Sequence, residues 1–223
     1  MAVANLAQDI ASHLTRQGLP PTTAWLNKFL STQRQAPLPA LKQSAMFKIL
    51  QTDITLSLQD SPPSIFPHDI ANGEIQERQV PGPIPVQILD IEDIGRSRWS
   101  QIEALEAEER GEKTKGREII RVVPGEDDDS VDSRQQSTGP HKLLLQDSRG
   151  TSAYAMELIG IQGLDLNINI GAKLLLSNVT VARGVLLLDP RNTTVLGGKI
   201  EDLHKQWKEG RKEALRSAIQ PRS

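Results

Sequence analysis

The sequence predicts an α+β fold in which a three-helix bundle is followed by a small closed β-barrel and a final helix. Three observations lead to this prediction. Apolar residues recur at helical spacing in the first 60 residues, five short strand-like segments follow residue 84, and an amphipathic stretch ends the chain. A chain of 223 residues is long enough for one large domain or two small ones. We expect a bundle at 1–60, a connector at 61–83 and a barrel domain at 84–223.

The N-terminal bundle is predicted from three amphipathic stretches. The first ends at Gly18, where a C-terminal cap is expected, and the second carries Trp25 on its apolar face. Pro37 and Pro39 interrupt the pattern, and the third stretch then continues towards Ile54. The three apolar faces consist of Leu6, Ile10 and Leu14; Trp25, Leu26, Phe29 and Leu30; and Leu41, Ala45, Ile49 and Leu50.

The barrel is predicted from five strand-like segments that follow the connector, which is rich in proline and glycine and has little expected regular structure. They cover residues 86–91, 142–147, 152–158, 173–181 and 185–188. Five strands closed on themselves leave no exposed edge, which is the arrangement of the OB-fold. Gly184 and Gly197-Gly198 flank the last strand and are expected at backbone conformations that side chains disfavour. In the closing helix, at about 199–218, Trp207 is expected to anchor the helix on the barrel.

A long insertion, at about 95–141, separates the first two predicted strands. Barrel connections normally take 2 to 6 residues, whereas about 50 residues lie here. Residues 98–109 are predicted to be helical, with Trp99, Ile102 and Leu105 aligned on one face. The remainder, about 110–140, has few core-forming residues. Long loops in compact domains are usually functional or disordered.

The insertion carries the candidate partner-binding residues. Its first half, from Arg110 to Arg121, is basic, whereas residues 122–132 contain five acidic residues and no basic one. Between these halves lies the only concentrated apolar segment of the loop, which can form an extended strand or anchor on a partner. The alternative is a disordered loop with a chance apolar stretch. The candidate residues are Arg110, Lys113, Lys115, Arg117, Ile119, Ile120, Arg121, Val122, Val123 and Pro124.

The sequence offers no recognisable catalytic or metal site. It has no cysteine, and its four histidines are scattered without paired metal-ligand spacing. No phosphate-binding loop or nucleophile elbow occurs, and the acidic run at 126–129 lacks the spacing of a calcium loop. No apolar run approaches the roughly 20 residues of a membrane span. We therefore expect a soluble, intracellular protein that is not an enzyme, binds no cofactor and has no membrane partner.

The barrel is poorly equipped to bind single-stranded nucleic acid. The formal net charge is −2, and from residue 84 onward the only aromatic residues are Trp99, Tyr154 and Trp207. Because Trp207 is assigned to the closing helix, Tyr154 is the one aromatic residue on a predicted strand, and we interpret it as a packing residue. One stacked base contributes only about 1–3 kcal/mol. We expect the barrel to bind protein. Direct binding of single-stranded DNA is the alternative, and the basic half of the insertion favours it.

Several segments resemble the RecQ-mediated genome instability protein 1 family, over nearly the whole chain. In the N-terminal region they are Pro20-Pro21 with Trp25-Leu26, and Thr52-Asp53-Ile54. The first barrel strand continues through 91–94 to 100–102 as in that family. The longest match, at 184–198, reads G-x-L-L-L-x-P-x-N-x-x-V-L-G-G.

The resemblance implies a non-catalytic adaptor with an N-terminal helical bundle and an OB-fold. Members of this family bind a type IA topoisomerase III and act with a RecQ-family helicase in dissolving double Holliday junctions. Their insertion between the first two strands reaches the topoisomerase gate and favours decatenation. The resemblance therefore also implies a nuclear location and contact with DNA mainly through the complex. The related Tudor-family partner of topoisomerase III, which has a much shorter insertion, is the alternative.

Overall fold

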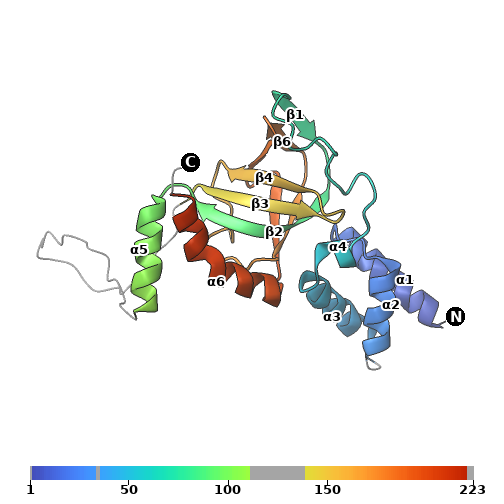
Figure 1. The fold of residues 1–223 in the computed structure, drawn as a ribbon. Coiled ribbons are helices and arrows are strands. Elements are labelled where there is room, and N and C mark those ends of the chain that lie inside the picture. Colours follow the sequence, from blue (N-terminus) through green and yellow to red (C-terminus); the bar gives the residue numbers. More distant parts are fainter. Residues whose placement is uncertain (1, 34–35, 111–138, 220–223) are drawn as a thin grey trace, which may run out of the picture.

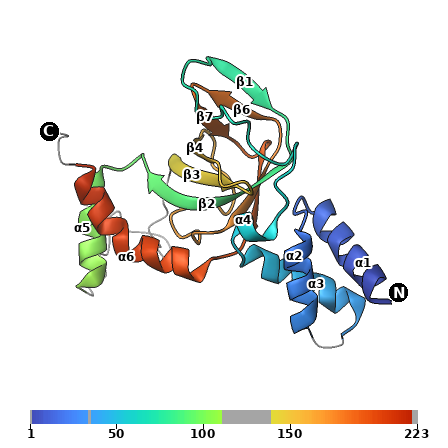
Figure 2. The same cartoon turned by 45° about the vertical axis from the view of Figure 1, so that its right-hand side comes forward.

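Helices lie on two sides of a central β-barrel in the computed structural model (Figure 1). The structure describes residues 2–33, 36–110 and 139–219. The N-terminal helices α1 to α4 pack at one side of the barrel, whereas α5 (Arg98–Glu109) and α6 (Glu201–Ser217) lie together at the other side (Figures 1 and 2). The predicted α+β fold, with N-terminal helices, an OB-fold barrel and a C-terminal helix, is confirmed in outline.

The N-terminal helices form where the apolar pattern predicts them. They are α1 (Ala2–Arg16), α2 (Thr23–Thr32), α3 (Leu38–Leu50) and the short α4 (Ile54–Ser57). Gly18, at φ 78°, follows the end of α1 as predicted. The prediction that the third helix continues towards Ile54 was wrong. A new helix starts there because the carboxylate of Asp53 accepts the N–H of Thr55 at 2.8 Å and caps α4.

The barrel is one eight-stranded sheet curved into a half-barrel, with β1 and β8 at its edges, where five strands closed on themselves were predicted. The eight strands are β1 (Glu77–Val80), β2 (Ile84–Asp93), β3 (His141–Asp147), β4 (Ser152–Glu157), β5 (Lys173–Leu176), β6 (Val179–Ala182), β7 (Val185–Leu188) and β8 (Thr193–Gly197). Their order in the sheet is β1-β6-β7-β4-β3-β2-β5-β8. All neighbouring pairs are antiparallel except β4 and β7, which run parallel.

Three local features explain the wrong strand count. The predicted segment 173–181 breaks into β5 and β6 because Asn178 turns the chain at a φ of 52°. The connector was predicted to lack regular structure, but its end forms β1, which pairs with β6. The segment after the Asp189-Pro190 turn forms β8, which pairs with β5. Gly184 and Gly198 have the positive φ angles predicted for them, 78° and 101°. Gly198 faces the carbonyl oxygen of Leu50 so closely that a side chain would collide with it.

A buried polar contact joins the helical bundle to the barrel. Gln87 in β2 is fully buried, and its Oε1 accepts the N–H of Ile54 at 3.0 Å. Its Nε2 donates to Gln146 at 2.9 Å and lies 3.4 Å from the carboxylate of Asp53. These bonds satisfy an amide that would be costly to bury without partners. Strand β2 therefore fixes the first turn of α4 and, through it, the bundle.

The opposing residue in β5, Lys173, is buried at the same junction. It pairs with Gln87 across the strands, is 1% exposed, and donates from Nζ to the carbonyl oxygen of Gly171 at 2.7 Å. Burial lowers the pKa of the Lys173 ammonium from 10.5 to about 8, and the negative charge of Asp53 opposes this shift. Below pH 8 the fold therefore carries the cost of a buried positive charge.

Replacing Trp25 by alanine should lower the free energy of unfolding by about 3–5 kcal/mol, because the ring is buried. Trp25 is 8% exposed, stacks on Phe29 with ring centroids 5.5 Å apart, and donates from Nε1 to Thr52. Urea denaturation measures the change. Phe47→Ala is the control, since Phe47 on α3 is 65% exposed and should change stability little. Equal midpoints for the two variants would contradict this account of the bundle core.

The stability of the wild-type protein should rise relative to Lys173→Met between pH 8 and pH 10.5. In this window the unfolded chain holds the proton that folded Lys173 has lost, so raising the pH favours the folded state. The full difference is roughly 3 kcal/mol at 1.36 kcal/mol per pKa unit. Comparing the two proteins by denaturation at each pH cancels the titration of the other groups. A constant difference across the window would show that Lys173 titrates normally.

Candidate protein-binding site

The insertion leaves and re-enters the barrel through two short segments, 92–98 and 139–141, which we call the stem. Between them, α5 projects away from the barrel, with α6 alongside it (Figures 1 and 2). The predicted helix at 98–109 is thus confirmed. Of the predicted binding residues, only Arg110 is described; it is exposed directly after α5, and its N–H donates to Glu106. The others lie outside the described residues: Lys113, Lys115, Arg117, Ile119, Ile120, Arg121, Val122, Val123 and Pro124.

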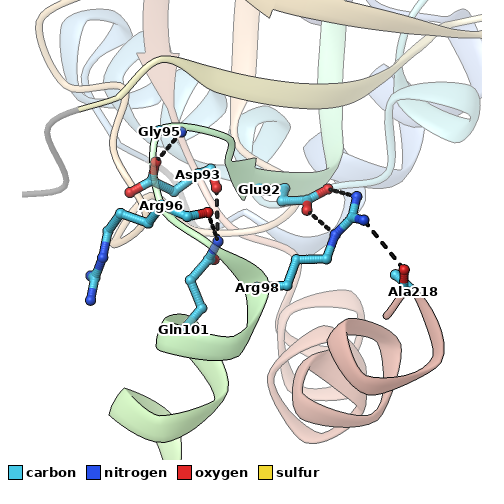
Figure 3. Close-up of polar contacts among 7 residues, drawn as sticks. All are labelled: Glu92, Asp93, Gly95, Arg96, Arg98, Gln101 and Ala218. Atoms are coloured by element: carbon cyan, nitrogen blue, oxygen red, sulfur yellow. Dashed lines mark hydrogen bonds and ion pairs between the residues drawn. The ribbon is translucent and has the colours of Figure 1, made fainter. Parts of the chain in front are cut away.

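The exit side of the stem is held by a buried amide. Gln101 in α5 is 3% exposed and donates from Nε2 to two backbone carbonyl oxygens, those of Asp93 at 2.8 Å and Arg96 at 3.2 Å (Figure 3). The carboxylate of Asp93, itself buried, accepts the N–H of Gly95 at 2.9 Å. Side chains thus form hydrogen bonds with three backbone groups of the turn between β2 and α5, and these bonds fix the backbone conformation of the turn.

Charged contacts and apolar packing together hold α5 to the rest of the protein. Arg98 donates from Nε to Glu92 at 2.6 Å and from Nη1 to the carbonyl oxygen of Ala218 at 3.4 Å, joining β2, α5 and the end of α6 (Figure 3). The hydrogen bond and charge of Glu92 raise the pKa of the Arg98 guanidinium. Two further ion pairs, Lys212–Glu109 and Arg216–Glu106, measure 2.5 Å each. Exposed pairs of this kind contribute about 0–1 kcal/mol each. The main stabilisation comes from burial of Ile102, Ala107 and Leu215.

The return side of the stem runs antiparallel to the exit side and directly beside it, as a continuation of the β2–β3 pairing. The N–H of Ile94 donates to the carbonyl oxygen of Pro140 at 3.0 Å. A Cβ on Gly95 would lie 2.5 Å from the carbonyl oxygen of Gly139, so a glycine is needed for the two backbones to approach this closely. Next to Gly139, Nδ1 of His141 lies 2.5 Å from the carboxylate of Glu157, and both side chains are buried. The two ends of the insertion are thus fixed against each other.

A cleft of about 450 Å³ lies between β2, α5 and α6, beside the stem. Trp207 of α6 lines it and donates from Nε1 to Asp90 of β2 at 2.7 Å, while it packs against the barrel core. This confirms Trp207 as the anchor of the closing helix. The guanidinium of Arg211 lies over the ring, 4.8 Å from its centroid. Within the described parts of the chain, no group of three or more histidine or acidic residues can hold a metal ion. None of the described helices is long and apolar enough to cross a membrane.

Exposed apolar side chains are concentrated around the stem. Nine large apolar residues are exposed among those described. Six of them belong to the stem or stand, along the chain, within two positions of a residue that is part of the stem or contacts it. We call these six the apolar collar: Ile94, Trp99, Met156, Leu158, Ile159 and Ile219. Clustered exposed apolar residues mark protein-interaction surfaces more often than single ones do.

Two aromatic residues differ from their predicted roles. Trp99 was predicted to align with Ile102 and Leu105, but it is 62% exposed in the first turn of α5, whereas Ile102, one turn later, is buried. Tyr154 was interpreted as a packing residue, but it points outward from β4 and is 50% exposed. The ammonium of Lys142 lies over its ring, 4.4 Å from the centroid.

The stem residues were not identified as functional from the sequence. Glu92 and Gln101 stand in the segments that carry the family resemblance, without an assigned role. His141 and Glu157 stand at the first position of β3 and the last position of β4, where a buried charged residue is unusual. Their pairing depends on the strand register, in which Lys142 lies opposite Met156.

Comparison with known proteins agrees with this architecture. A family model described as "RMI1, N-terminal OB-fold domain" matches residues 66–211, and one described as "RMI1, N-terminal helical domain" matches residues 14–57. The chain is also 30% identical to RecQ-mediated genome instability protein 1 of Schizosaccharomyces pombe over 220 residues, covering 91% of this chain and 92% of the relative. The chain belongs to the RMI1 family.

Other relatives match shorter parts of their own length. RecQ-mediated genome instability protein 1 of Mus musculus is 29% identical over 168 residues, which are 71% of this chain and 24% of the mouse protein. Tudor domain-containing protein 3 of Xenopus tropicalis is 41% identical over 78 residues, 34% of this chain and 11% of that protein. The chain thus spans nearly all of the fission yeast RMI1 relative but about a quarter of the mouse one.

Replacing Gly95 by alanine should destabilise the protein by about 1–3 kcal/mol, the usual cost of overpacking, because the new methyl group meets the backbone of Gly139. Thermal or urea denaturation measures the loss. Gly160→Ala is the matched control, since no described atom lies within 4 Å of a Cβ placed there. If both variants unfold alike, Gly95 and Gly139 do not approach each other as closely as the structure shows.

Proposed function

We propose that this RMI1-family chain is a non-catalytic adaptor that binds a type IA topoisomerase III. With a RecQ-family helicase, it would promote decatenation and the dissolution of double Holliday junctions in the nucleus. Family membership supports a role in RecQ-mediated genome stability. The observation that carries the proposal is the apolar collar, six exposed apolar residues in or near the fixed stem of a long insertion.

The collar has the properties of a protein-docking surface. Its apolar side chains lie at or just beyond the ends of β2, β4 and α6, and on the first turn of α5, whose backbone Gln101 and Arg98 hold in place. An exposed tryptophan on a fixed backbone loses little conformational entropy when it binds, and such residues often dominate protein interfaces. The partner that fits is a protein with an apolar surface around an opening that receives the insertion.

Direct binding of single-stranded DNA is the second candidate. The observation that favours it is the outward ring of Tyr154 with Lys142 above it, on strands β3 and β4, where OB-folds bind oligonucleotides. However, Asp90 and Glu92 lie on the same outer face of the neighbouring strand, and their charges repel phosphate. One stacking residue contributes about 1–3 kcal/mol, too little for tight binding. Tight binding of oligonucleotides that weakens steeply with added salt would favour this second function.

If the collar provides affinity and the insertion acts on the topoisomerase, the two properties should separate. Replacing residues 111–138 by a short Gly/Ser linker should leave the barrel folded, since loop closure changes by under about 1.5 kcal/mol. We expect weakened but measurable binding to topoisomerase III, and loss of most of the stimulation of decatenation. Trp99→Ala with Ile159→Ser should instead reduce affinity at least tenfold, because these two collar side chains are 62% and 59% exposed and would be buried by the partner.

Phe47→Ala with Leu56→Ser is the matched control, because both residues are exposed apolar positions in the N-terminal helices and outside the collar. Titration against purified topoisomerase III and a gel assay of linked DNA circles provide the two measurements. If the control weakens binding as much as the collar variant, the docking surface is wrongly placed. If the protein without residues 111–138 stimulates decatenation as strongly as the wild type, the insertion does not act on the topoisomerase and is only a spacer.

A further inference from the structure

A buried pair of polar side chains, His141 and Glu157, lies where β3 begins and β4 ends. Their side chains are 3% and 4% exposed, and Nδ1 of His141 lies 2.5 Å from Oε2 of Glu157, within hydrogen-bond distance. The same Oε2 accepts the backbone N–H of His141 at 3.2 Å, and Oε1 accepts the N–H of Ile161 at 2.8 Å. Two apolar residues of similar volume would fill the space, but they would leave the backbone N–H groups of His141 and Ile161 without these acceptors.

The pair differs from an apolar filling because its bonds have direction. The carboxylate holds both the ring and the backbone of His141, the first residue of β3 after the insertion. It therefore fixes where the returning chain enters the sheet, including the rotation of the peptide before it. Buried polar groups often select one geometry among several of similar stability, and this is the role that an apolar pair cannot fill.

The pair lies directly against Gly139, where the two stem segments approach each other most closely. A Cβ on Gly139 would lie 3.1 Å from Oε2 of Glu157 and 3.3 Å from the ring of His141. Gly139 in turn supports Gly95 on the exit side, and Pro140 accepts the N–H of Ile94. The buried pair thus contacts the return segment, and the return segment contacts the exit segment. A shift of the pair would therefore move the N-terminal end of α5.

We propose that His141 and Glu157 are positioning residues that set the direction in which the insertion leaves the barrel. The pair acts through Gly139 and Pro140 on Ile94 and Gly95, and so on α5. It touches no partner itself, because both side chains are buried. This inference rests on the proposed function of the insertion. It adds that the action of the insertion on the topoisomerase depends on a pair inside the barrel, whereas docking through the collar does not.

The test replaces the pair in two ways. The double variant His141→Leu with Glu157→Leu keeps the volume but removes the directional bonds. His141→Asn keeps a donor near the position of Nδ1 and should therefore behave nearly like the wild-type protein. Asp147→Asn is the matched control, since Asp147 is a buried carboxylate at the other end of β3, where it accepts the N–H of Phe66 at 2.8 Å. If the double leucine variant does not fold, Glu157→Gln takes its place.

The first readout needs no partner. Amide exchange of Ile94, measured by NMR, reports the bond to Pro140, and we expect it to accelerate at least tenfold in the double leucine variant. It should change less than threefold in His141→Asn and Asp147→Asn. The second readout is function: stimulation of decatenation should fall at least fivefold in the double leucine variant, while affinity for topoisomerase III stays within twofold.

The outcomes separate this inference from the proposed function. Unchanged exchange of Ile94 would overturn the inference whatever the decatenation assay gives. Faster exchange with normal decatenation would also overturn it, provided that replacing 111–138 abolishes stimulation. A parallel loss of affinity would assign the pair to docking and overturn the inference as well. If replacing 111–138 has no effect on decatenation, the proposed function of the insertion fails, and exchange of Ile94 still decides whether the pair fixes the stem.

Discussion

The buried amide of Gln87 is the contact on which the arrangement of the whole chain depends. It accepts the first N–H of α4 from within β2, so the helical bundle is oriented by a strand of the barrel rather than by a flexible linker. The other end of β2 carries Glu92 and Asp93, which hold the exit of the insertion. One strand therefore relates the bundle, the barrel and the insertion to each other, and a change in its register would move all three.

Exposed apolar residues and buried polar residues meet at the stem, which reverses the usual distribution of a globular protein. Trp99 and Leu158 face solvent, whereas Gln101, His141 and Glu157 lie inside. Each arrangement costs stability by itself. They are consistent with each other if the polar groups fix the backbone and the apolar groups use that fixed backbone to bind, because a rigid surface loses less entropy on association.

Local patterns predicted the helices and the inner strands well, because burial imposes a period that a sequence displays. The helix at 98–109 and the anchoring role of Trp207 follow from such periods. Strands β1 and β8 were missed because edge strands are short, half-exposed and next to prolines or glycines. The exposure of Trp99 was missed for a related reason: a spacing of three residues suggests a shared helix face, but only the position of α6 decides which residues it covers.

The stem contacts were beyond sequence analysis because they depend on residues far apart in the chain. Gly95 and Gly139 meet only when β2 and β3 pair in the observed register, and the 43 positions between them carry no sign of that contact. Under the proposed function, the same geometry contributes something that the length of the insertion alone would not. A loop with free ends samples many directions, and its effective concentration at a distant site is low. Fixing both ends and extending one of them as a helix packed on α6 restricts those directions before any partner binds. Under the proposed function, the buried contacts of the stem therefore contribute to the action of the insertion without touching its target.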